Sequence, residues 1–282
     1  MADVRSGVNP ASEESAASTR IDPSVPHPAR RYDYWLGGKD NFAADRQSGD
    51  AVAAAYPAIR TTVIENRRFM QRATRYLADT AGVRQFLDIG TGIPTSPNLH
   101  EIAQGVAPES RVVYVDNDPI VLTHARALLT SAPEGATAYV DADLRDPERI
   151  LGHPDVRAAL DFDRPLALML VAILHFLTDA DDPYAITRGL VDALPSGSYL
   201  VVSHATTDLV PRDVAATAAP VTTTSMIDMA FRSRDQFASF FAGLELVPPG
   251  ITPVTEWQPD DPAEVRAAAA QASMYAAVAR KP

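Results

Sequence analysis

The chain of 282 residues contains no cysteine. Disulfide bonds, thiolate metal sites and cysteine nucleophiles are therefore excluded. It also lacks a long hydrophobic run. The longest, Leu166 to Leu177, has 12 residues, whereas a membrane-spanning helix needs about 20. The N-terminal residues show no charged segment followed by an apolar one, as a secretory signal would. We therefore expect no membrane partner and a cytoplasmic location.

Positive charge is also scarce. Lys and Arg number 25 against 36 Asp and Glu, which gives a net charge of −11. Such a chain repels phosphate backbones unless a local basic patch overcomes the repulsion. The arginines form only isolated pairs, Arg30–Arg31 and Arg67–Arg68, so we expect no nucleic-acid partner. The hydrophobic fraction of 46%, in contrast, is enough for a folded core.

Three regions of the chain differ in character. Residues 1–20 are small and polar without periodicity, which predicts a disordered leader. Residues 21–81 begin with an aromatic-rich segment, expected to be an ordered but irregular arm. They end with a covering helix over Thr61–Ala81, whose apolar residues recur at helical spacing. Residues 82–282 form the expected core.

Within the core, short apolar segments alternate with helical segments. Strands that are apolar at nearly every position indicate a sheet covered on both faces. We predict an α/β, Rossmann-like fold: a mostly parallel seven-stranded sheet with helices on both faces and an antiparallel edge. The predicted strands are Gln85–Ile89, Val112–Val115, Thr137–Val140, Leu166–Ile173, Ser198–Ser203, Leu244–Val247 and Met274–Ala279.

A glycine-containing loop follows the first strand and carries the first chemical signal. Ligands of open parallel sheets bind at the carboxyl ends of the strands, and Gly90 and Gly92 let the backbone approach a ligand closely. A dinucleotide would need a third glycine at the position of Thr95 and a free donor where Pro94 has none. Asp88 would also oppose a pyrophosphate. This carboxylate favours a cationic ligand with ammonium and sulfonium groups, such as S-adenosylmethionine.

The next two strands also end in acidic residues. Asp116 follows the second strand, where a carboxylate can accept hydrogen bonds from both ribose hydroxyls. Asp118 is better explained as a helix cap. Asp143 and Leu144 follow the third strand and suit an adenine amino group and ring face. The three carboxylates at successive strand ends predict a cofactor site.

Two histidines follow the fourth and fifth strands. His175 is a candidate general base or substrate contact, and the alternative is a histidine that only hydrogen-bonds at a strand end. His204 is a weaker candidate for the substrate pocket. None of the six histidines has metal-ligand spacing, so we expect no metal. In the arm, the segment 37–41 (GGKDN) is interpreted either as a lid over the cofactor or as a turn packed on the sheet.

Over residues 20–280 the sequence resembles a known family. The motifs FLDIGTGIPT, RVVYVDNDPIVLTHARALL, ADLRDP and LVAILHFL are similar to those of class I S-adenosylmethionine-dependent methyltransferases. More specifically, the chain resembles a family of S-adenosyl methyltransferases that is widespread in actinobacteria. The function of much of that family is unknown. The segments that carry this likeness are VPHPARRYDYWLGGKDNFAADR, ENRRFMQRATRYLA, DPYAIT, SYLVVSHAT and GLELVPPGITPVTEW.

The resemblance implies S-adenosylmethionine as the cofactor and assigns parts of it to residues. Asp88, Gly90 and Gly92 would surround the methionine part, Asp116 the ribose, and Asp143 with Leu144 the adenine. The arm would lie near the same pocket. Further cofactor-binding candidates are Tyr32, Gly38, Lys39 and Asn41 in the arm, and Thr91, Asn117 and Ala172 at the strand ends.

The leading hypothesis is a methyltransferase that acts on a small molecule, including secondary metabolites. Its acceptor pocket would be bounded by the arm and the segment Ala205–Phe231. A protein that binds the cofactor for regulation without turnover is the first alternative. A nicotinamide-dependent oxidoreductase is the second, and Asp88 and Pro94 disfavour it. The sequence names neither the acceptor nor the oligomeric state.

Overall fold

The computed structural model describes residues 21–128, 130–216, 229–259 and 266–282. The predicted leader, residues 1–20, lies outside these ranges, as does part of the segment Ala205–Phe231. The strands are β1 (Gln85–Ile89), β2 (Arg111–Asp116), β3 (Ala136–Asp141), β4 (Ala167–Val171), β5 (Tyr199–Ala205), β6 (Glu245–Leu246), β7 (Thr252–Pro253) and β8 (Met274–Arg280).

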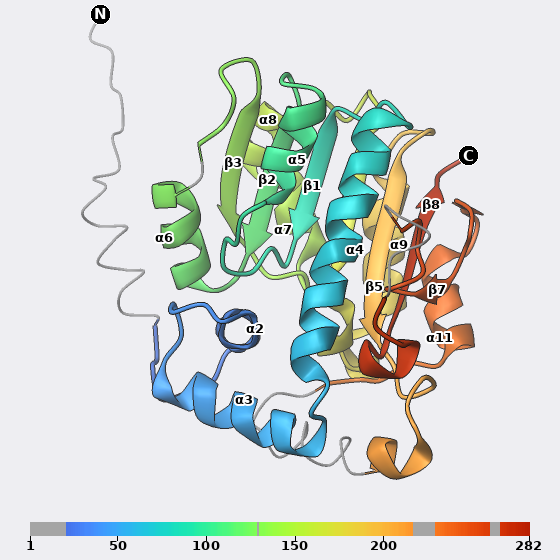
Figure 1. Ribbon diagram of the computed structural model, residues 1–282. Coiled ribbons are helices and arrows are strands. Elements are labelled where there is room, and N and C mark those ends of the chain that lie inside the picture. Colours follow the sequence, from blue (N-terminus) through green and yellow to red (C-terminus); the bar gives the residue numbers. More distant parts are fainter. Residues whose placement is uncertain (1–20, 129, 217–228, 260–265) are drawn as a thin grey trace, which may run out of the picture.

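Helices connect and flank these strands (Figure 1). The α-helices are α2 (Pro28–Leu36), α3 (Ala43–Ala55), α4 (Ile59–Asp79), α5 (Leu99–Val106), α6 (Pro119–Leu128), α7 (Pro147–Gly152), α8 (Pro154–Ala159), α9 (Pro183–Asp192) and α11 (Arg234–Ala238). Short 3₁₀ turns are η1 (Leu174–Phe176), η2 (Asp179–Asp181), η3 (Ser239–Phe241) and η4 (Ala269–Gln271). No helix in the described part of the chain is long and apolar enough to cross a bilayer.

The strands form one sheet in the order β3-β2-β1-β4-β5-β8-β6, with β7 also paired to β8. The first five strands of this order are parallel, and β8 runs antiparallel to β5, β6 and β7. This confirms the predicted fold class. The strand count differs by one, because the two-residue β7 has too little pattern to be recognised. The strand order reverses between β1 and β4, which is where ligands bind in such sheets.

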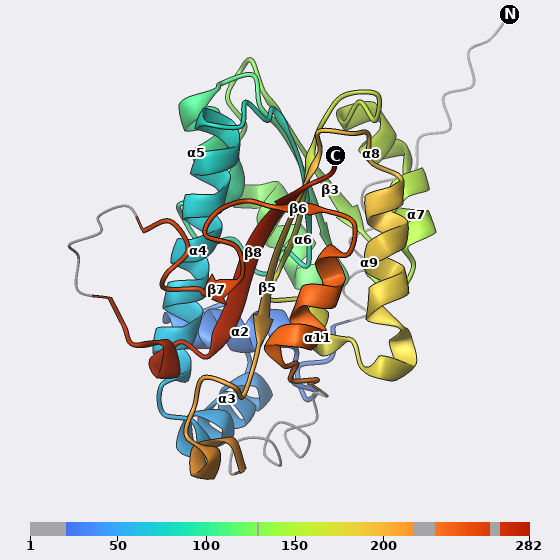
Figure 2. The same ribbon diagram turned by 90° about the vertical axis from the view of Figure 1, so that its right-hand side faces the viewer.

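Two hydrophobic cores cover the sheet, one on each face. Every residue of β1 is buried, and its side chains alternate between the two cores. Phe86 packs with Phe69 and Leu77 of α4, whereas Leu87 packs with Leu168 of β4 in the other core. Figure 2 shows α4 and α5 on one side of the sheet and α7, α8, α9 and α11 on the other. This double burial explains why the strands are apolar throughout.

The arm is helical rather than irregular, which corrects the prediction. Pro28 starts α2 after His27, whose ring accepts from the N–H of Ala29. Gly37 ends the helix with a φ of 86°, a conformation that glycine adopts without strain. Short helices flanked by glycines and aromatic residues carry little periodic signal, so the sequence did not reveal α2 and α3. Figure 1 shows both helices at the end of the sheet to which β1, β2 and β3 point.

The covering helix and the fourth strand shift slightly from their predicted bounds. Helix α4 spans Ile59–Asp79, against the predicted Thr61–Ala81. Strand β4 ends at Val171, two residues before the predicted end, because Ala172 has a φ of 57°. A positive φ cannot continue an extended strand. The turn at Ala172 lies at the point where the strand order reverses.

Candidate functional site

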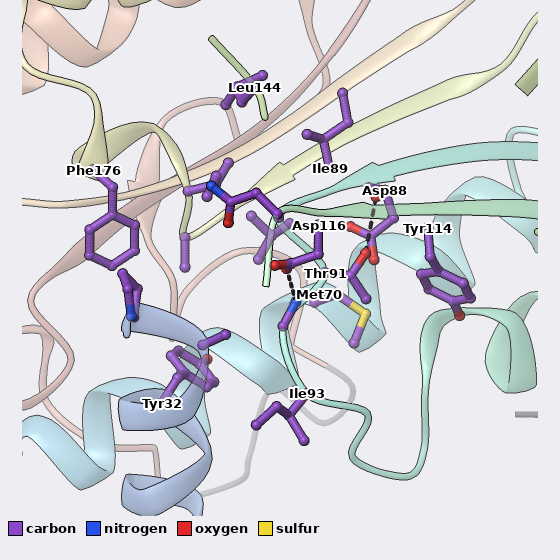
Figure 3. Close-up of a pocket in the computed structure, with 18 of the residues that line it drawn as sticks. Tyr32, Met70, Asp88, Ile89, Thr91, Ile93, Tyr114, Asp116, Leu144 and Phe176 are labelled. Atoms are coloured by element: carbon purple, nitrogen blue, oxygen red, sulfur yellow. Dashed lines mark hydrogen bonds between the residues drawn. The ribbon is translucent and has the colours of Figure 1, made fainter. Parts of the chain in front are cut away.

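A cavity of about 370 Å³ opens at the carboxyl ends of β1, β2 and β3 (Figure 3). Helix α2 of the arm closes it from the opposite side, and α4 contributes one wall. We call it the first cavity. Ten of the predicted cofactor residues line it: Tyr32, Asp88, Gly90, Thr91, Gly92, Asp116, Asn117, Asp143, Leu144 and Ala172.

The glycine-containing loop after β1 is held by contacts to Ile173 and to Asp116. Gly90 has a φ of 76°, and a Cβ at this position would lie 2.6 Å from a side-chain carbon of Ile173. Gly92 also has a positive φ, and its N–H donates to Oδ2 of Asp116 at 2.8 Å. The other oxygen, Oδ1 of Asp116, accepts from the N–H of Asp118. Asp116 therefore ties the loop after β1 to the end of β2, and burial raises the pKa of its carboxyl.

Asp88 faces the same cavity from β1 and is almost fully buried. Burial raises the pKa of its carboxyl to about 7, although the Arg67 guanidinium acts in the opposite direction. The Asp116 carboxylate adds a smaller effect that also raises the pKa. Near neutral pH this carboxyl is thus poised between its two protonation states. A cation bound in the cavity would favour the carboxylate.

Arg67 is a residue that the sequence reasoning missed. It lies on α4, lines the first cavity, and donates from its Nη2 to the carbonyl of Pro97. Its Nε is buried and has no hydrogen-bond partner among the described residues. Burial lowers the pKa of the guanidinium, and the neighbouring Asp88 opposes that shift. One wall of the cavity therefore presents a cation and a carboxyl together.

A chain of hydrogen bonds joins the arm to the sheet beside this wall. The hydroxyl of Tyr32 donates to the carbonyl of Val63 and accepts from the amide of Asn66. The amide oxygen of Asn66 accepts from the hydroxyl of Ser203, which in turn accepts from the N–H of Ala172. The position of Tyr32 over the cavity is therefore set by α4, β5 and the turn after β4.

The far end of the cavity carries the residues expected near adenine. The amide of Asn117 donates to Oδ2 of Asp143 at 2.9 Å, and the N–H of Arg145 donates to Oδ1. Arg145 is a second lining residue that the sequence reasoning missed; its guanidinium also pairs with Asp181. Leu144 is buried and supplies an apolar surface next to these polar groups. An amino group and an aromatic ring fit this combination.

Three of the predicted arm residues do not line the first cavity: Gly38, Lys39 and Asn41. They belong to a turn around Asp33. Its Oδ2 accepts from the N–H of Asp40 and the amide of Asn41, while a Cβ on Gly38 would meet the Asp33 carboxylate. The described contacts of this segment are those of a turn against Asp33 of α2, and none of the three residues is among those that line the first cavity.

A second cavity, of about 100 Å³, adjoins the first. Its walls come from α2, α3, α4, η1, the end of β5 and residues near Phe231. Four residues line both cavities: Pro28, Tyr32, Ala172 and Phe176. Most other side chains on its walls are apolar, including those of Trp35, Val52, Val63 and Met274.

The two candidate histidines have different surroundings. His175 lines the second cavity, and its Nδ1 is buried without a partner among the described residues. Burial holds the pKa of His175 well below its usual value, and the charges of Arg31 and Arg232 act in the same direction. His204 lines neither cavity. Its Nδ1 contacts the carbonyl of Ala205 and its Nε2 contacts Arg232, and burial lowers its pKa to about 3. A catalytic role for His204 has no support from this geometry.

Comparisons with known proteins agree with the site. The family model described as S-adenosyl methyltransferase matches residues 14–282. The chain belongs to the S-adenosyl methyltransferase family. A DUF574 family protein from Streptomyces avermitilis is 52% identical, with a TM-score of 0.87 over 93% of this chain and 100% of that one. A proposed methyltransferase from Thermobifida fusca is 42% identical, with a TM-score of 0.83 over 92% and 96%. None of the curated proteins matches the chain.

More distant structures share the fold alone. The mitomycin 7-O-methyltransferase MmcR is 17% identical, with a TM-score of 0.52 over 95% of this chain and 75% of that one. The cofactor of this S-adenosyl methyltransferase is S-adenosylmethionine. The first cavity fits that molecule, because Arg67 and Asp88 offer opposite charges to a zwitterionic methionine end. The described residues contain no group of three or more His, Asp or Glu side chains that could hold a metal ion.

Proposed function

We propose that this methyltransferase binds S-adenosylmethionine in the first cavity and a small-molecule acceptor in the second. The observation that carries the proposal is the border between them, formed by Pro28, Tyr32, Ala172 and Phe176. Methyl transfer requires the acceptor atom to approach the sulfonium methyl in line, with water excluded. Two adjoining cavities that share a wall satisfy this requirement.

The residues on the first cavity support one orientation of the cofactor. Asp88 and Arg67 would hold the amino and carboxylate groups of the methionine part, because charged hydrogen bonds of both signs are available there. Asp116 would accept from the ribose hydroxyls. The adenine would then lie against Leu144, with its amino group toward Asn117 and Asp143. In this orientation the sulfonium faces the shared border.

In this mechanism the bound cofactor supplies an electrophilic methyl group, and the chain supplies position. Gly90 and Gly92 let the backbone approach the methionine part, while Tyr32 covers the reacting centre from the arm. His175 contacts the acceptor rather than taking a full proton. Its pKa is well below the usual value, so an imidazolium beside Arg31 and Arg232 is unfavourable.

Two observations favour a small molecule over a nucleic acid as the acceptor. The net charge of −11 repels phosphate backbones, and the second cavity has mainly apolar walls. The cytoplasmic location and the three-part division at residues 20 and 81 stay predictions from the sequence.

Calorimetry and a methyl-transfer assay on the same protein test the proposal. Purified protein should bind S-adenosylmethionine and convert it to S-adenosylhomocysteine with a responsive member of a panel of small hydroxyl and amino compounds. Val52→Phe, which fills the second cavity, should abolish transfer and leave cofactor affinity unchanged. Val106→Phe, on an exposed face of α5, is the matched control.

Other results would point to the alternatives. Tight cofactor binding with no turnover across the panel would favour a regulatory protein. Stabilisation by NAD(P), but not by S-adenosylmethionine, would overturn the proposal in favour of an oxidoreductase.

A further inference from the structure

Several polar groups line the second cavity, and most of those described already hydrogen-bond within the protein. The hydroxyl of Tyr56 donates to the carbonyl of Ala270, and that of Ser273 donates to the carbonyl of Thr206. Tyr32 donates to Val63 and accepts from Asn66, as described above. These hydroxyls already have partners in the protein. His175 is different, because its buried Nδ1 has none among the described residues.

The charged side chains among the described residues that line this cavity are of one sign. Arg31 lines it from α2 and is 1% exposed. Its guanidinium donates to the hydroxyl of Ser48 and lies over the ring of Trp35 at 5.1 Å. No Asp or Glu occurs among the described residues that line the cavity. Asp45 lies close enough to favour the charged form of Arg31, but its carboxylate also accepts from the N–H groups of His27 and Phe42.

This inventory discriminates between acceptor classes. An ammonium group would enter an apolar cavity next to Arg31, with no carboxylate among the described lining residues, at a high desolvation cost. A neutral hydrocarbon would leave the imidazole of His175 without a partner. An oxyanion would find a cation and a neutral imidazole that carries one N–H donor. Walls of Trp35, Val52 and Val63 suit an apolar ring as the rest of the molecule.

We infer that the acceptor is a weakly acidic hydroxyl compound, a phenol or an enol on an apolar ring, and that it binds as its oxyanion beside Arg31 and His175. This inference rests on the proposed function, because it assumes that the second cavity is the acceptor site. It makes Arg31 a specificity-determining residue. The isolated arginine pair Arg30–Arg31 gives the chain no nucleic-acid surface. Its second member, Arg31, would instead select the acceptor from the wall of the second cavity.

The chemistry of the step balances without a further reactant. The hydroxyl proton goes to solvent when the acceptor binds. An oxygen lone pair then forms the bond to the methyl carbon while the carbon–sulfur bond breaks, and that electron pair stays on sulfur. A methyl ether and a thioether remain, both neutral at the reacting atoms. Because opposite charges cancel in this step, a weakly polar cavity favours it.

The test uses 4-nitrophenol, which is yellow as the phenolate and colourless as the phenol, with the full chain saturated with S-adenosylhomocysteine. The apparent pKa of the bound probe should fall by about one unit or more, which is a tenfold preference for the oxyanion. Arg31→Gln should abolish the shift, and Arg31→Lys should keep part of it. Arg46→Gln, which removes the same charge from an exposed position on α3, is the control and should keep all of it.

Competition provides a second readout that needs no variant. 4-Nitrobenzylamine, a cation of similar shape, should displace 4-nitrophenol at least tenfold more weakly than 4-nitrothiophenol, an anion. Binding of the probe as the neutral phenol, or stronger competition by the amine, would overturn the inference. Calorimetry with S-adenosylhomocysteine distinguishes a failure of this inference from a failure of the proposed function. If S-adenosylhomocysteine binds but the spectrum of 4-nitrophenol does not change, the inferred acceptor class is wrong and the proposed cofactor site stands.

Discussion

The two cavities adjoin each other, yet they are built in different ways. The first takes its polar groups from the carboxyl ends of neighbouring parallel strands: Asp88 lies near the end of β1, Asp116 ends β2 and Asp143 follows β3. The second is enclosed by α2, α3, α4 and the end of β5, and Arg31 is the one cation among the described residues that line it. The proposed cofactor site is therefore formed mainly by the sheet, and the proposed acceptor site mainly by the helices of the arm that pack over it.

This difference separates the residues proposed to bind the cofactor from those proposed to select the acceptor. Strand ends of a parallel sheet converge whatever the side chains are, so a site there needs few residues to be completed. A cavity between helices depends on how each helix is rotated and how close it packs. The second cavity can consequently change its acceptor through substitutions in the arm without disturbing the first.

The largest loss of cofactor affinity is expected from a substitution at Asp116 in the first cavity. Asp116→Asn should weaken S-adenosylmethionine binding about 100-fold, because charged hydrogen bonds to the ribose are each worth about 1.5–3 kcal/mol. It would also loosen the contact to Gly92. The matched control is Asp141→Asn, which loses the same charge at the end of β3, beside Asp116 in the sheet but outside the cavity lining. Calorimetry measures the S-adenosylmethionine affinity of both variants. An equal loss of affinity in both would mean that Asp116 acts only through net charge, and it would contradict the assignment of Asp116 to the ribose.

Arg67 tests whether the methionine end is held by charge. Arg67→Met should weaken S-adenosylmethionine binding by about tenfold to thirtyfold, since a charge-assisted pair is lost. It should leave 5′-methylthioadenosine unaffected, because that compound lacks the amino and carboxylate groups. Arg68→Met removes a neighbouring guanidinium that is exposed and paired with Glu65, and it should change neither affinity. Equal losses for both ligands in Arg67→Met would place its effect on folding rather than on the carboxylate.

The different origins of the cavities explain what the sequence could predict. Asp88, Gly90 and Asp116 were recognisable because strands are read from their apolar runs, and the residue after each run lies at the ligand edge. Arg67 was not, because arginines on an amphipathic helix are expected to face solvent, and only the packing of α4 turns this one toward the strand ends. The second cavity left no local pattern at all. Its walls join Val52, Val63 and Met274, which are far apart in the chain.

The two histidines also show what the sequence alone cannot predict. Both His175 and His204 follow strands, so the sequence treats them alike. Tertiary contacts separate them: Arg232 contacts Nε2 of His204, whereas the ring of His175 is left at a cavity wall. A strand-end position predicts nearness to the site but not which ring nitrogen stays available.

The protonation of Asp88 predicts a pH dependence of cofactor binding to the first cavity. Burial raises the pKa of this carboxyl to about 7 in the free protein. A bound ammonium favours the carboxylate, so below this pKa binding must release a proton. The affinity for S-adenosylmethionine should therefore fall by up to about tenfold for each pH unit below 7 and level off above it. Calorimetry between pH 6 and 8 measures this slope. Asp88→Asn should remove it, and 5′-methylthioadenosine, which has no ammonium group, should bind without it.

The smallest effect is expected at Lys39, in the turn that packs around Asp33. Its neighbours Gly38 and Asn41 contact Asp33, and none of the three lines a cavity. Lys39→Ala should therefore change S-adenosylmethionine affinity by no more than about twofold, as for surface substitutions that remove no buried contact. Gly38→Ala is the informative partner, because its Cβ would collide with the Asp33 carboxylate and shift the arm. Melting temperature and calorimetry on both variants distinguish a turn from a lid. A loss of affinity in Lys39→Ala at unchanged stability would mean that the lysine reaches the cofactor, which would contradict its placement in a turn outside the first cavity.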